Sequence, residues 1–323
     1  MCFMKKEDFK VLGLDDVLAG LERDGFAIGL VDPEVYHGWK RVIPNCVSKS
    51  MLTEFAENAL LFHMNEVEGR KVERRGFRMG SAVDAAVLTP EVFARRYFWE
   101  EKQVALTKSG EPAKNGAQDP EQKARWAARA AAGDVLMDEA EYAEVLRVAG
   151  NVRDAWRGLG LTVGENALSQ VAMFVRVEEV GGERLAVPLV VFGMLDLMPL
   201  EGRELEGREL WDLKTTSRGV SEGALNAQVA EYGYGLQAAL YADLFAVCTG
   251  EERVFRFLFA EVVPPYQCRV VEMPWLAMDG YRVRYERLLW EYARCVATGD
   301  WGGPVLPTMV YEMPVWEKRK IEK

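Results

Sequence analysis

Apolar residues recur at helical spacing through the first half of the chain. This periodicity predicts helices over residues 14–24, 48–66, 81–97 with a break at Pro90, 121–132 and 138–158. Ser48 or Ser50 is the expected N-cap of the second helix, because a serine hydroxyl can accept a hydrogen bond from a free backbone N–H of the first turn. Residues 107–120 are rich in Gly, Pro, Ser and Asn, which predicts a surface loop.

From about residue 168 the pattern changes from helical to extended. Two apolar runs, QVAMFVRVEEV and LAVPLVVFGMLDLMPL, flank the turn signal Gly-Gly-Glu at 181–183 and predict a β-hairpin. The pattern then predicts a strand over Leu210–Thr216, a helix over 223–247, strands over 253–263 and 267–274, and a helix over 275–298. This order predicts an α+β fold with a mixed central β-sheet flanked by helices and a helical N-terminal elaboration.

The charge balance limits how this chain could bind nucleic acid. The 323 residues include 40 Lys and Arg against 50 Asp and Glu, a net charge of −10. A protein that binds nucleic acid through its bulk charge would be basic, so any such contact needs a local basic patch or bridging metal ions. No run of eighteen apolar residues occurs, and the first ten residues lack the apolar stretch of a secretory signal. We therefore expect no membrane span and a cytoplasmic location.

Cysteine and histidine are too sparse for several common kinds of site. The five cysteines form no Cys-x-x-Cys pair, and their spacing fits neither a zinc nor an iron–sulfur site, so we expect free thiols. The only histidines are His37 and His63, and neither lies in a hydrolase or metalloprotease motif. The phosphate-binding glycine patterns are absent as well. Any catalysis is therefore expected to use carboxylates, lysine and a hard metal ion.

The most informative segment is GMLDLMPLEGRELEGRELWDLKTT, residues 193–216. Asp196 lies late in one predicted strand, and Asp212 and Lys214 lie on the next, where residues two apart face the same side. If the two strands pair through the turn at 199–209, Asp196 comes close to Asp212. Asp-x-Lys is common by chance, and the alternative is that these residues face solvent. The apolar flanks favour buried strands, which rarely carry unpaired Asp and Lys.

Two neighbouring carboxylates repel each other unless a cation lies between them. Mg²⁺ or Mn²⁺ prefers oxygen ligands and would remove this repulsion. Such an ion can activate a water molecule and stabilise the charge that develops on a phosphodiester. An adjacent lysine could orient or deprotonate that water, or stabilise the pentavalent phosphate.

Two further features are candidates for contacts with a nucleic acid. Gln237 and Tyr241 are four residues apart on one helix face, where an amide and a phenol could hold a phosphate or a nucleotide edge. The alternative is a helix that packs its tyrosine on the sheet and leaves its glutamine at the surface. The segment GRKVERRGFR at 69–78 concentrates positive charge in an acidic chain, as a phosphate-contacting patch or as a solvated helix face. Its cations are Arg70, Lys71, Arg74, Arg75 and Arg78.

Taken together, these motifs resemble the PD-(D/E)xK nuclease superfamily. The set Gly193-x-x-Asp196, Asp212-x-Lys214-Thr-Thr and Gln237-x-x-x-Tyr241 is similar to its RecB-type and RecE-type exonuclease branch, as are VYHGW, VSKSMLTEFAENALLFH and GDWGGP. The resemblance implies an α/β/α nuclease core in one domain at 35–323, after an N-terminal segment at 1–34. Within the domain, 35–165 would be mostly helical and 166–323 would be the catalytic β-sheet core.

The resemblance also implies roles for individual residues. Asp196 and Asp212 would bind Mg²⁺ or Mn²⁺ together with the backbone carbonyl of Leu213, and Lys214 would be the catalytic lysine. Gln237 and Tyr241 would help to place the DNA strand end. Such nucleases digest linear double-stranded DNA from the 5′ end and work with a single-strand annealing recombinase. Relatives of this kind assemble as rings, which implies a homo-oligomer.

The chain departs from the family pattern at two positions. Asp84 stands where a Gly-x-x-x-His helix motif, here beginning at Gly80, would place a histidine, and an aspartate there could still bind a metal ion. Gln170 stands where a strand glutamate is expected, and an amide is a weaker, neutral ligand. These departures motivate a second hypothesis, a DNA-end-binding or recombinase-partner module with weakened catalysis. A third is a site-specific endonuclease on the same core.

Overall fold

The computed structural model describes residues 6–67, 78–107, 109–200, 209–303, 310–313 and 317–318. The helices are η1 (Lys6–Asp8), α1 (Leu14–Arg23), α2 (Pro33–Trp39), α3 (Lys49–Glu57), α4 (Ala59–Val67), α5 (Arg78–Leu88), α6 (Pro90–Arg96), α7 (Pro120–Ala131), α8 (Glu139–Gly158), α9 (Glu222–Glu231), α10 (Tyr234–Thr249) and α11 (Trp275–Thr298). The strands are β1 (Phe26–Leu30), β2 (Cys46–Ser48), β3 (Tyr97–Phe98), β4 (Val135–Leu136), β5 (Ala167–Val180), β6 (Glu183–Pro199), β7 (Glu209–Thr216), β8 (Val254–Glu261) and β9 (Cys268–Met273).

The described residues form a seven-stranded mixed sheet with the order β1-β5-β6-β7-β8-β9, and β2 pairs with the middle of β6. The β7–β8 and β2–β6 pairs are parallel, and the other pairs are antiparallel. The expected hairpin is the β5–β6 pair, with the turn at Gly181 and Gly182, where φ is positive. The short strands β3 and β4 form a separate two-stranded sheet.

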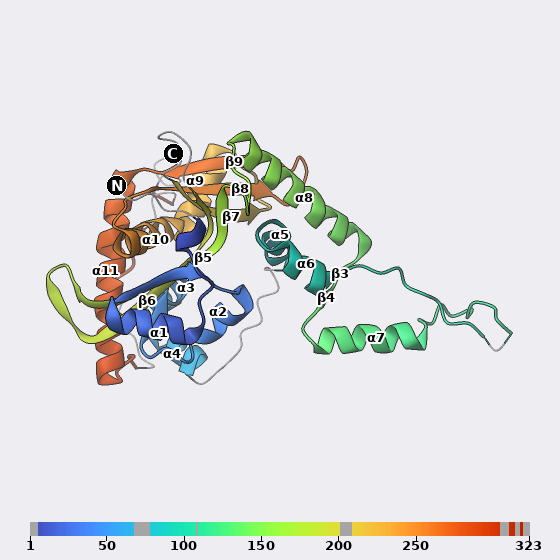
Figure 1. Ribbon diagram of the computed structural model, residues 1–323, viewed down its shortest axis with the longest axis horizontal. Helices are drawn as coiled ribbons and strands as arrows, with labels where there is room; N and C mark the ends of the chain where they lie inside the picture. The colour runs from blue at the N-terminus through green and yellow to red at the C-terminus, as the bar shows by residue number, and fades with distance from the viewer. Residues whose placement is uncertain are drawn as a thin grey trace.

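Helices cover both faces of the large sheet (Figure 1). One apolar core joins the sheet to α1, α2, α3, α10 and α11, and a second joins it to α5, α6 and α8. Strand β7 shows why both cores form, because Leu210 belongs to the first core and Trp211 and Leu213 belong to the second. The predicted fold class, α+β with a mixed sheet flanked by helices, is confirmed.

The N-terminal half is less purely helical than expected. Strands β1 and β2 come from this half and add to the large sheet, β1 along β5 and β2 along β6. They have only five and three residues, too few for a readable alternation of apolar and polar positions. The division at residue 35 stays a prediction, and β1 from the first part of the chain pairs with β5 from the second.

Two expected helices are each divided in two. The segment 48–66 forms α3 and α4, because Asn58 leaves the helical conformation and its side chain accepts a hydrogen bond from Leu61 N–H at 2.9 Å. The segment 223–247 forms α9 and α10, which are separated at Tyr232 and Gly233. The φ angle of Gly233 is +61°, a left-handed conformation that ends the first helix.

The segment between β3 and β4 projects from the body of the protein (Figure 1). It contains the expected loop, which folds back on itself through the bridges Val104–Gln118 and Leu106–Pro112, and then α7. Gln122 of α7 is buried, and its side chain accepts from Gln103 N–H and donates to the carbonyl of Glu101. These hydrogen bonds give the projecting segment its own small polar centre.

The described cysteines, Cys46, Cys248, Cys268 and Cys295, are all free thiols, as expected. Among the helices of the described residues, none combines the length and the apolar character that a bilayer-spanning helix needs.

Candidate active site

Strands β6 and β7 separate immediately after they meet. Among the described residues, β6 and β7 pair at Leu197 and Trp211, so Asp196 and Asp212 are the next facing positions. Beyond this pair the acceptor for β7 is a side chain of β6 and not its backbone. Asp196 Oδ2 accepts a hydrogen bond from Leu213 N–H at 2.8 Å. The expected approach of Asp196 to Asp212 across the turn is therefore confirmed.

Asp212 and Lys214 point to the same side of β7, as their spacing predicts. The ammonium Nζ of Lys214 lies 2.5 Å from Asp212 Oδ2, and Asp212 is only 3% exposed. Gln237 of α10 is also buried, and its amide Nε2 donates to Asp212 Oδ1. The glutamine predicted to contact DNA thus holds the carboxylate of Asp212 in this structure, and its contact with DNA stays a prediction.

Tyr241 lies one helical turn after Gln237 and packs against β6. A Cβ atom built at Gly193 would lie 2.5 Å from Tyr241 Cε1, so the ring needs the glycine for its position. Burial raises the pKa of Tyr241, and the charges of Asp212 and Asp196 add to this shift, whereas Lys214 opposes it. The phenol is therefore a neutral group beside the carboxylates.

Asp84 reaches the same place from the other helical layer. Helix α5 approaches β7 at Gly80, where an added Cβ would lie 2.9 Å from Thr215 Oγ1. Asp84 follows one turn later. Burial raises its pKa to about 7, Lys214 opposes the shift and Asp212 adds to it. Asp84 thus stands in the electrostatic environment of the β7 residues, which agrees with its predicted place in the site.

The site holds more negative than positive side chains. Burial raises the pKa of Asp196 well above its usual value, and the charges of Asp212 and Asp84 raise it further. Burial opposes the charge of Lys214, but Asp212 and Asp196 outweigh it, so the pKa of Lys214 is raised. Lys214 is therefore an ammonium group at neutral pH, surrounded by carboxyl groups that are costly to ionise together.

The donor atoms suit a hard divalent cation. Asp212 Oδ2 is buried and accepts no hydrogen bond, although the Lys214 ammonium lies beside it, and the surrounding carboxylates offer only oxygen. In the part of the chain that the structure describes, no three Asp, Glu, His or Cys side chains are already arranged around one point as a metal cage. The residues therefore fit such an ion by donor chemistry.

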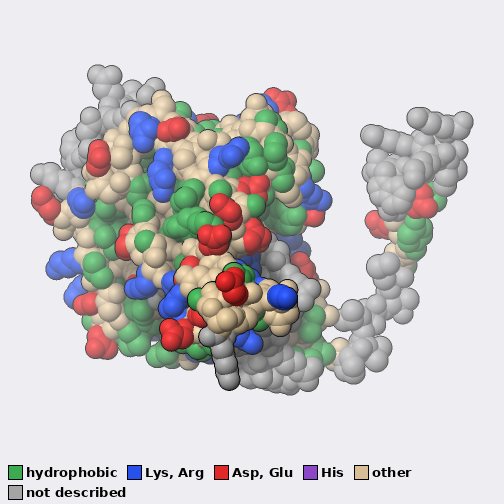
Figure 2. Space-filling view, turned by 90° about the vertical axis from the view of Figure 1, so that its right-hand side faces the viewer, with side chains coloured by type: hydrophobic (Ala, Val, Ile, Leu, Met, Phe, Trp, Pro, Cys, Tyr) green, Lys and Arg blue, Asp and Glu red, His purple; other side chains and the backbone are tan. Residues whose placement is uncertain are grey.

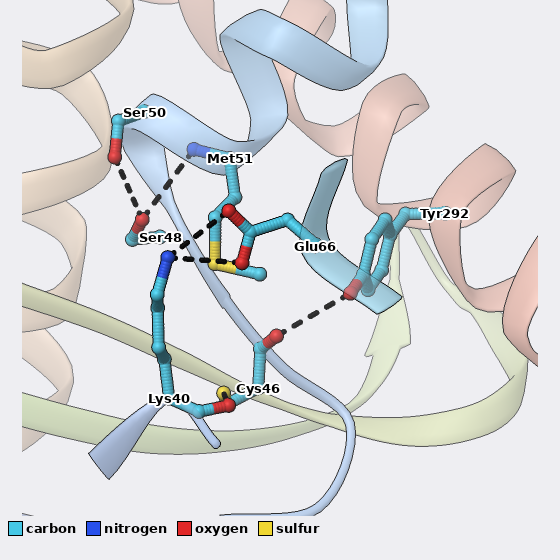
Figure 3. A network of polar contacts seen from close by, with 7 residues as sticks. All are labelled: Lys40, Cys46, Ser48, Ser50, Met51, Glu66 and Tyr292. Atoms are coloured by element: carbon cyan, nitrogen blue, oxygen red, sulfur yellow. Dashed lines mark hydrogen bonds and ion pairs between the residues drawn. The ribbon is translucent and has the colours of Figure 1, made fainter. Parts of the chain in front are cut away.

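Lys49 belongs to the site and was not singled out from the sequence. It is the first residue of α3, and the preceding Ser48 accepts a hydrogen bond from Met51 N–H at 3.4 Å (Figure 3). Strand β2 directly precedes α3, and the Tyr292 hydroxyl of α11 donates a hydrogen bond to the carbonyl of Cys46 in β2, at 3.4 Å. These contacts fix the start of α3, and the serine cap was the sequence signal that located it.

The Lys49 ammonium donates to the carbonyl of Tyr232 at 2.9 Å. Burial lowers its pKa to about 8, the charge of Lys214 lowers it further, and Asp212 partly offsets both. A second lysine therefore stands close enough to the Asp212–Lys214 pair to respond to its charges.

Gln170 lies opposite Asp196. The β5–β6 register pairs Ser169 with Leu197 and Val171 with Leu195, which places Gln170 across from Asp196. Its φ angle is +57°, an uncommon conformation for a residue other than glycine. The predicted position of Gln170 beside the carboxylates is therefore consistent with the sheet, at a point where the strand is locally irregular.

The basic stretch is only partly described. Arg74 and Arg75 lie outside the described residues. Arg78 is exposed at the start of α5 and forms an ion pair with Glu141 of α8, with 2.9 Å between Nη2 and Oε2. On the face seen in Figure 2, Lys and Arg side chains are interspersed with Asp and Glu. A role for Arg74, Arg75 and Arg78 in binding DNA stays a prediction.

No family model matches the chain, and no curated protein matches it. A crystal structure of a protein from Eubacterium rectale, provisionally described as an exonuclease, is similar with a TM-score of 0.49 and 15% identity over 87% of this chain and 96% of that one. A second solved structure, whose description names no activity, is similar with a TM-score of 0.27 and 14% identity over 74% of this chain and 85% of that one. These values are too low for either likeness to bear on function.

Proposed function

We propose that the protein is a metal-dependent deoxyribonuclease of the PD-(D/E)xK type. The observation that carries this proposal is the gathering of Asp196, Asp212 and Lys214 where β6 and β7 separate, with Asp84 near enough for their charges to affect its pKa. Buried carboxylates around one lysine are costly for folding, so a chemical role explains them better than a structural one. The proposed substrate is linear double-stranded DNA, digested from its ends in the 5′→3′ direction.

The residues of the site would have three roles: metal binding, positioning of a metal ligand, and stabilisation of charge on the phosphate. Asp196 and Asp212, with the carbonyl of Leu213 and with Asp84, would hold Mg²⁺ or Mn²⁺. When bound, such an ion supplies Lewis-acid stabilisation of the phosphodiester and an activated water. Gln237 keeps Asp212 in position through its hydrogen bond. Lys214, as an ammonium, stabilises the negative charge that develops on the phosphate and is a poor general base in its resting state.

The test is digestion of a linear duplex in Mg²⁺ and in Mn²⁺. Asp212→Asn keeps the acceptor for Gln237 but removes the charge, and Lys214→Met keeps the length of the side chain without its ammonium. We expect each to lower the cleavage rate by about 10²- to 10³-fold or more, the size typical of losing one transition-state charge contact. Asp154→Asn and Lys123→Met remove exposed charges from α8 and α7 and should leave the rate unchanged. Equal rates for Asp212→Asn and the wild type would contradict the proposal.

The same assay tests the strand polarity of digestion and the need for a free DNA end. Release of label from 5′ ends before 3′ ends supports the proposed polarity, and covalently closed circular DNA should remain intact. Cutting of the circle would instead indicate a site-specific endonuclease.

A DNA-end-binding module with weakened catalysis is the second candidate. Gln170 favours it, because a neutral amide stands opposite Asp196 where a further carboxylate would strengthen a metal site. Tight binding of DNA ends without cleavage in Mn²⁺ would select this reading.

The proposed assembly follows from the family resemblance alone. We propose a cytoplasmic homo-oligomeric ring that encircles duplex DNA and works with a single-strand annealing recombinase.

A further inference from the structure

A row of alternating cations and tyrosines leads away from the site. Its members are Lys214, Tyr234, Lys49, Tyr232 and Arg218, and we call it the cation–tyrosine strip. The residues come from three stretches of the chain: Lys214 and Arg218 at and after the end of β7, Tyr232 and Tyr234 between α9 and the start of α10, and Lys49 at the start of α3. Lys49 is 183 residues from Tyr232 along the chain, so only the tertiary fold completes the strip.

The inner part of the strip is built around the ring of Tyr234. The ammonium of Lys214 lies 4.9 Å from the centre of this ring, and the ammonium of Lys49 lies 5.5 Å from it. The ring packs on Phe257 of β8 with 5.6 Å between ring centres, which holds it against the sheet. Two positive groups therefore share one aromatic ring that is fixed by the core.

The outer part of the strip reaches solvent at Tyr232. Its ring centre lies 5.6 Å from that of Tyr234, and its backbone carbonyl accepts from Lys49. Arg218 donates to the Tyr232 hydroxyl at 3.2 Å, and the guanidinium carbon lies 5.7 Å from the ring centre. Tyr232 is 42% exposed, so a ligand can reach this residue.

One carboxylate opposes the outer cation. Glu231 pairs with Arg218 at 2.7 Å, and both side chains are about half exposed. An exposed pair of this kind contributes little free energy, so a phosphate group can displace the carboxylate at small cost. Lys49 and Lys214 carry the remaining positive charge of the strip.

We propose that the cation–tyrosine strip binds a DNA strand next to the scissile phosphate, with Tyr232 stacked on one nucleobase. Lys49 and Arg218 bind the phosphates on either side of that nucleotide. Alternating cations and aromatic rings match the alternating phosphates and bases of an unpaired strand. This inference rests on the proposed function, because Lys214 at the inner end of the strip marks the scissile phosphate.

The test is binding of a duplex that carries a three-nucleotide unpaired end with 2-aminopurine at one of its positions, in EDTA so that no cleavage occurs. Stacking on a tyrosine quenches this base, and we expect quenching at one position on one strand. Tyr232→Ala should abolish the quenching and weaken binding about tenfold, as the loss of one stacked base predicts. Tyr232→Phe and Tyr232→Trp keep an aromatic ring, so both the quenching and the wild-type affinity should be retained.

The matched control is Trp290→Ala, which removes an aromatic ring of the same 42% exposure from α11. It should change neither quenching nor affinity. Arg218→Ala should reduce by about one the slope of log affinity against log salt, because one phosphate contact is lost. Arg157→Ala, which removes an exposed and equally paired arginine from α8, should leave this slope unchanged.

The outcomes separate this inference from the proposed function. Wild-type quenching and affinity in Tyr232→Ala would overturn the strip while leaving the nuclease proposal intact. Tyr232-dependent quenching in a protein that does not cleave DNA in Mn²⁺ would support the strip and count against the nuclease. A wild-type protein that does not bind DNA ends would overturn both.

Discussion

Gly193 shows how one backbone position controls the shape of the candidate site. It lies on β6 directly beneath the ring of Tyr241, and an added Cβ would meet three ring atoms at 2.5 to 3.0 Å. The ring is held by α10 on one side and the sheet on the other, so it cannot move away without disturbing Gln237 one turn earlier. The Gly-x-x-Asp motif thus has a steric cause that the sequence does not reveal.

Gly193→Ala is therefore expected to destabilise the fold by about 1–3 kcal/mol, the usual cost of forcing an extra methyl into a packed core. Chemical denaturation followed by circular dichroism measures this change. The control is Gly150→Ala on α8, where an added Cβ meets nothing within 4 Å and alanine favours the helix. If Gly193→Ala is as stable as Gly150→Ala, the steric account of the Tyr241 position is wrong.

At the scale of elements, helices α10 and α11 act as one support for the site. Asp243 of α10 accepts from Arg282 Nε at 2.9 and 3.0 Å and from the Tyr285 hydroxyl at 2.5 Å, both on α11. Gly235 allows the close approach of the two helices, since a Cβ there would lie 2.0 Å from Tyr281 Cε2. Gln237 and Tyr241 lie between these two contacts and depend on both for their orientation.

Asp243→Ala should lower the free energy of unfolding by about 1–3 kcal/mol, because the hydroxyl of the buried Tyr285 loses its charged acceptor. Thermal or urea unfolding measures the loss. Asp154→Ala removes one partner of a fully exposed pair on α8 and should change stability by no more than about 0.5 kcal/mol. Equal effects of the two substitutions would contradict the bridging role of Asp243.

At the scale of the whole molecule, the body and the projecting segment are separable. None of the described residues between Phe98 and Val135 contributes to either apolar core, and the segment extends away from the sheet (Figure 1). The β3–β4 pair closes the base of the segment, and the Val104–Gln118 bridge closes the loop within it. The large sheet and the candidate site therefore do not depend on it for their apolar packing.

Replacing residues 105–117 by Asn-Gly, a dipeptide that favours a tight hairpin turn, should leave the unfolding midpoint of the body within about 2 °C of wild type. Differential scanning calorimetry measures this midpoint. The loss of α7 as well should give the same result when Phe98 is joined to Val135 through a flexible linker of about a dozen residues, the length that the parallel β3–β4 pair needs. A large drop in either variant would show that the segment stabilises the core.

Local pattern alone was sufficient for the central part of the site. Strand residues two apart share a face, so Asp212 and Lys214 were paired from their spacing, and the expected pairing of β6 with β7 brought Asp196 beside them. The sheet and most long helices followed from periodicity in the same way, since each depends on contacts between residues near in the chain. The breaks at Asn58 and Gly233 were missed because single residues ended otherwise continuous helical patterns.

Contacts between distant segments were decided only by tertiary packing. Asp84 and Lys49 reach the carboxylates because α5 and α3 dock from opposite layers, and the strands β1 and β2 exist only because longer strands offer them partners. The cation–tyrosine strip has the same origin, with members drawn from segments up to about 180 residues apart, as the Lys49–Tyr232 hydrogen bond shows. Chain spacing determines which side of an element a residue occupies, whereas the burial of apolar faces against one another decides which elements meet.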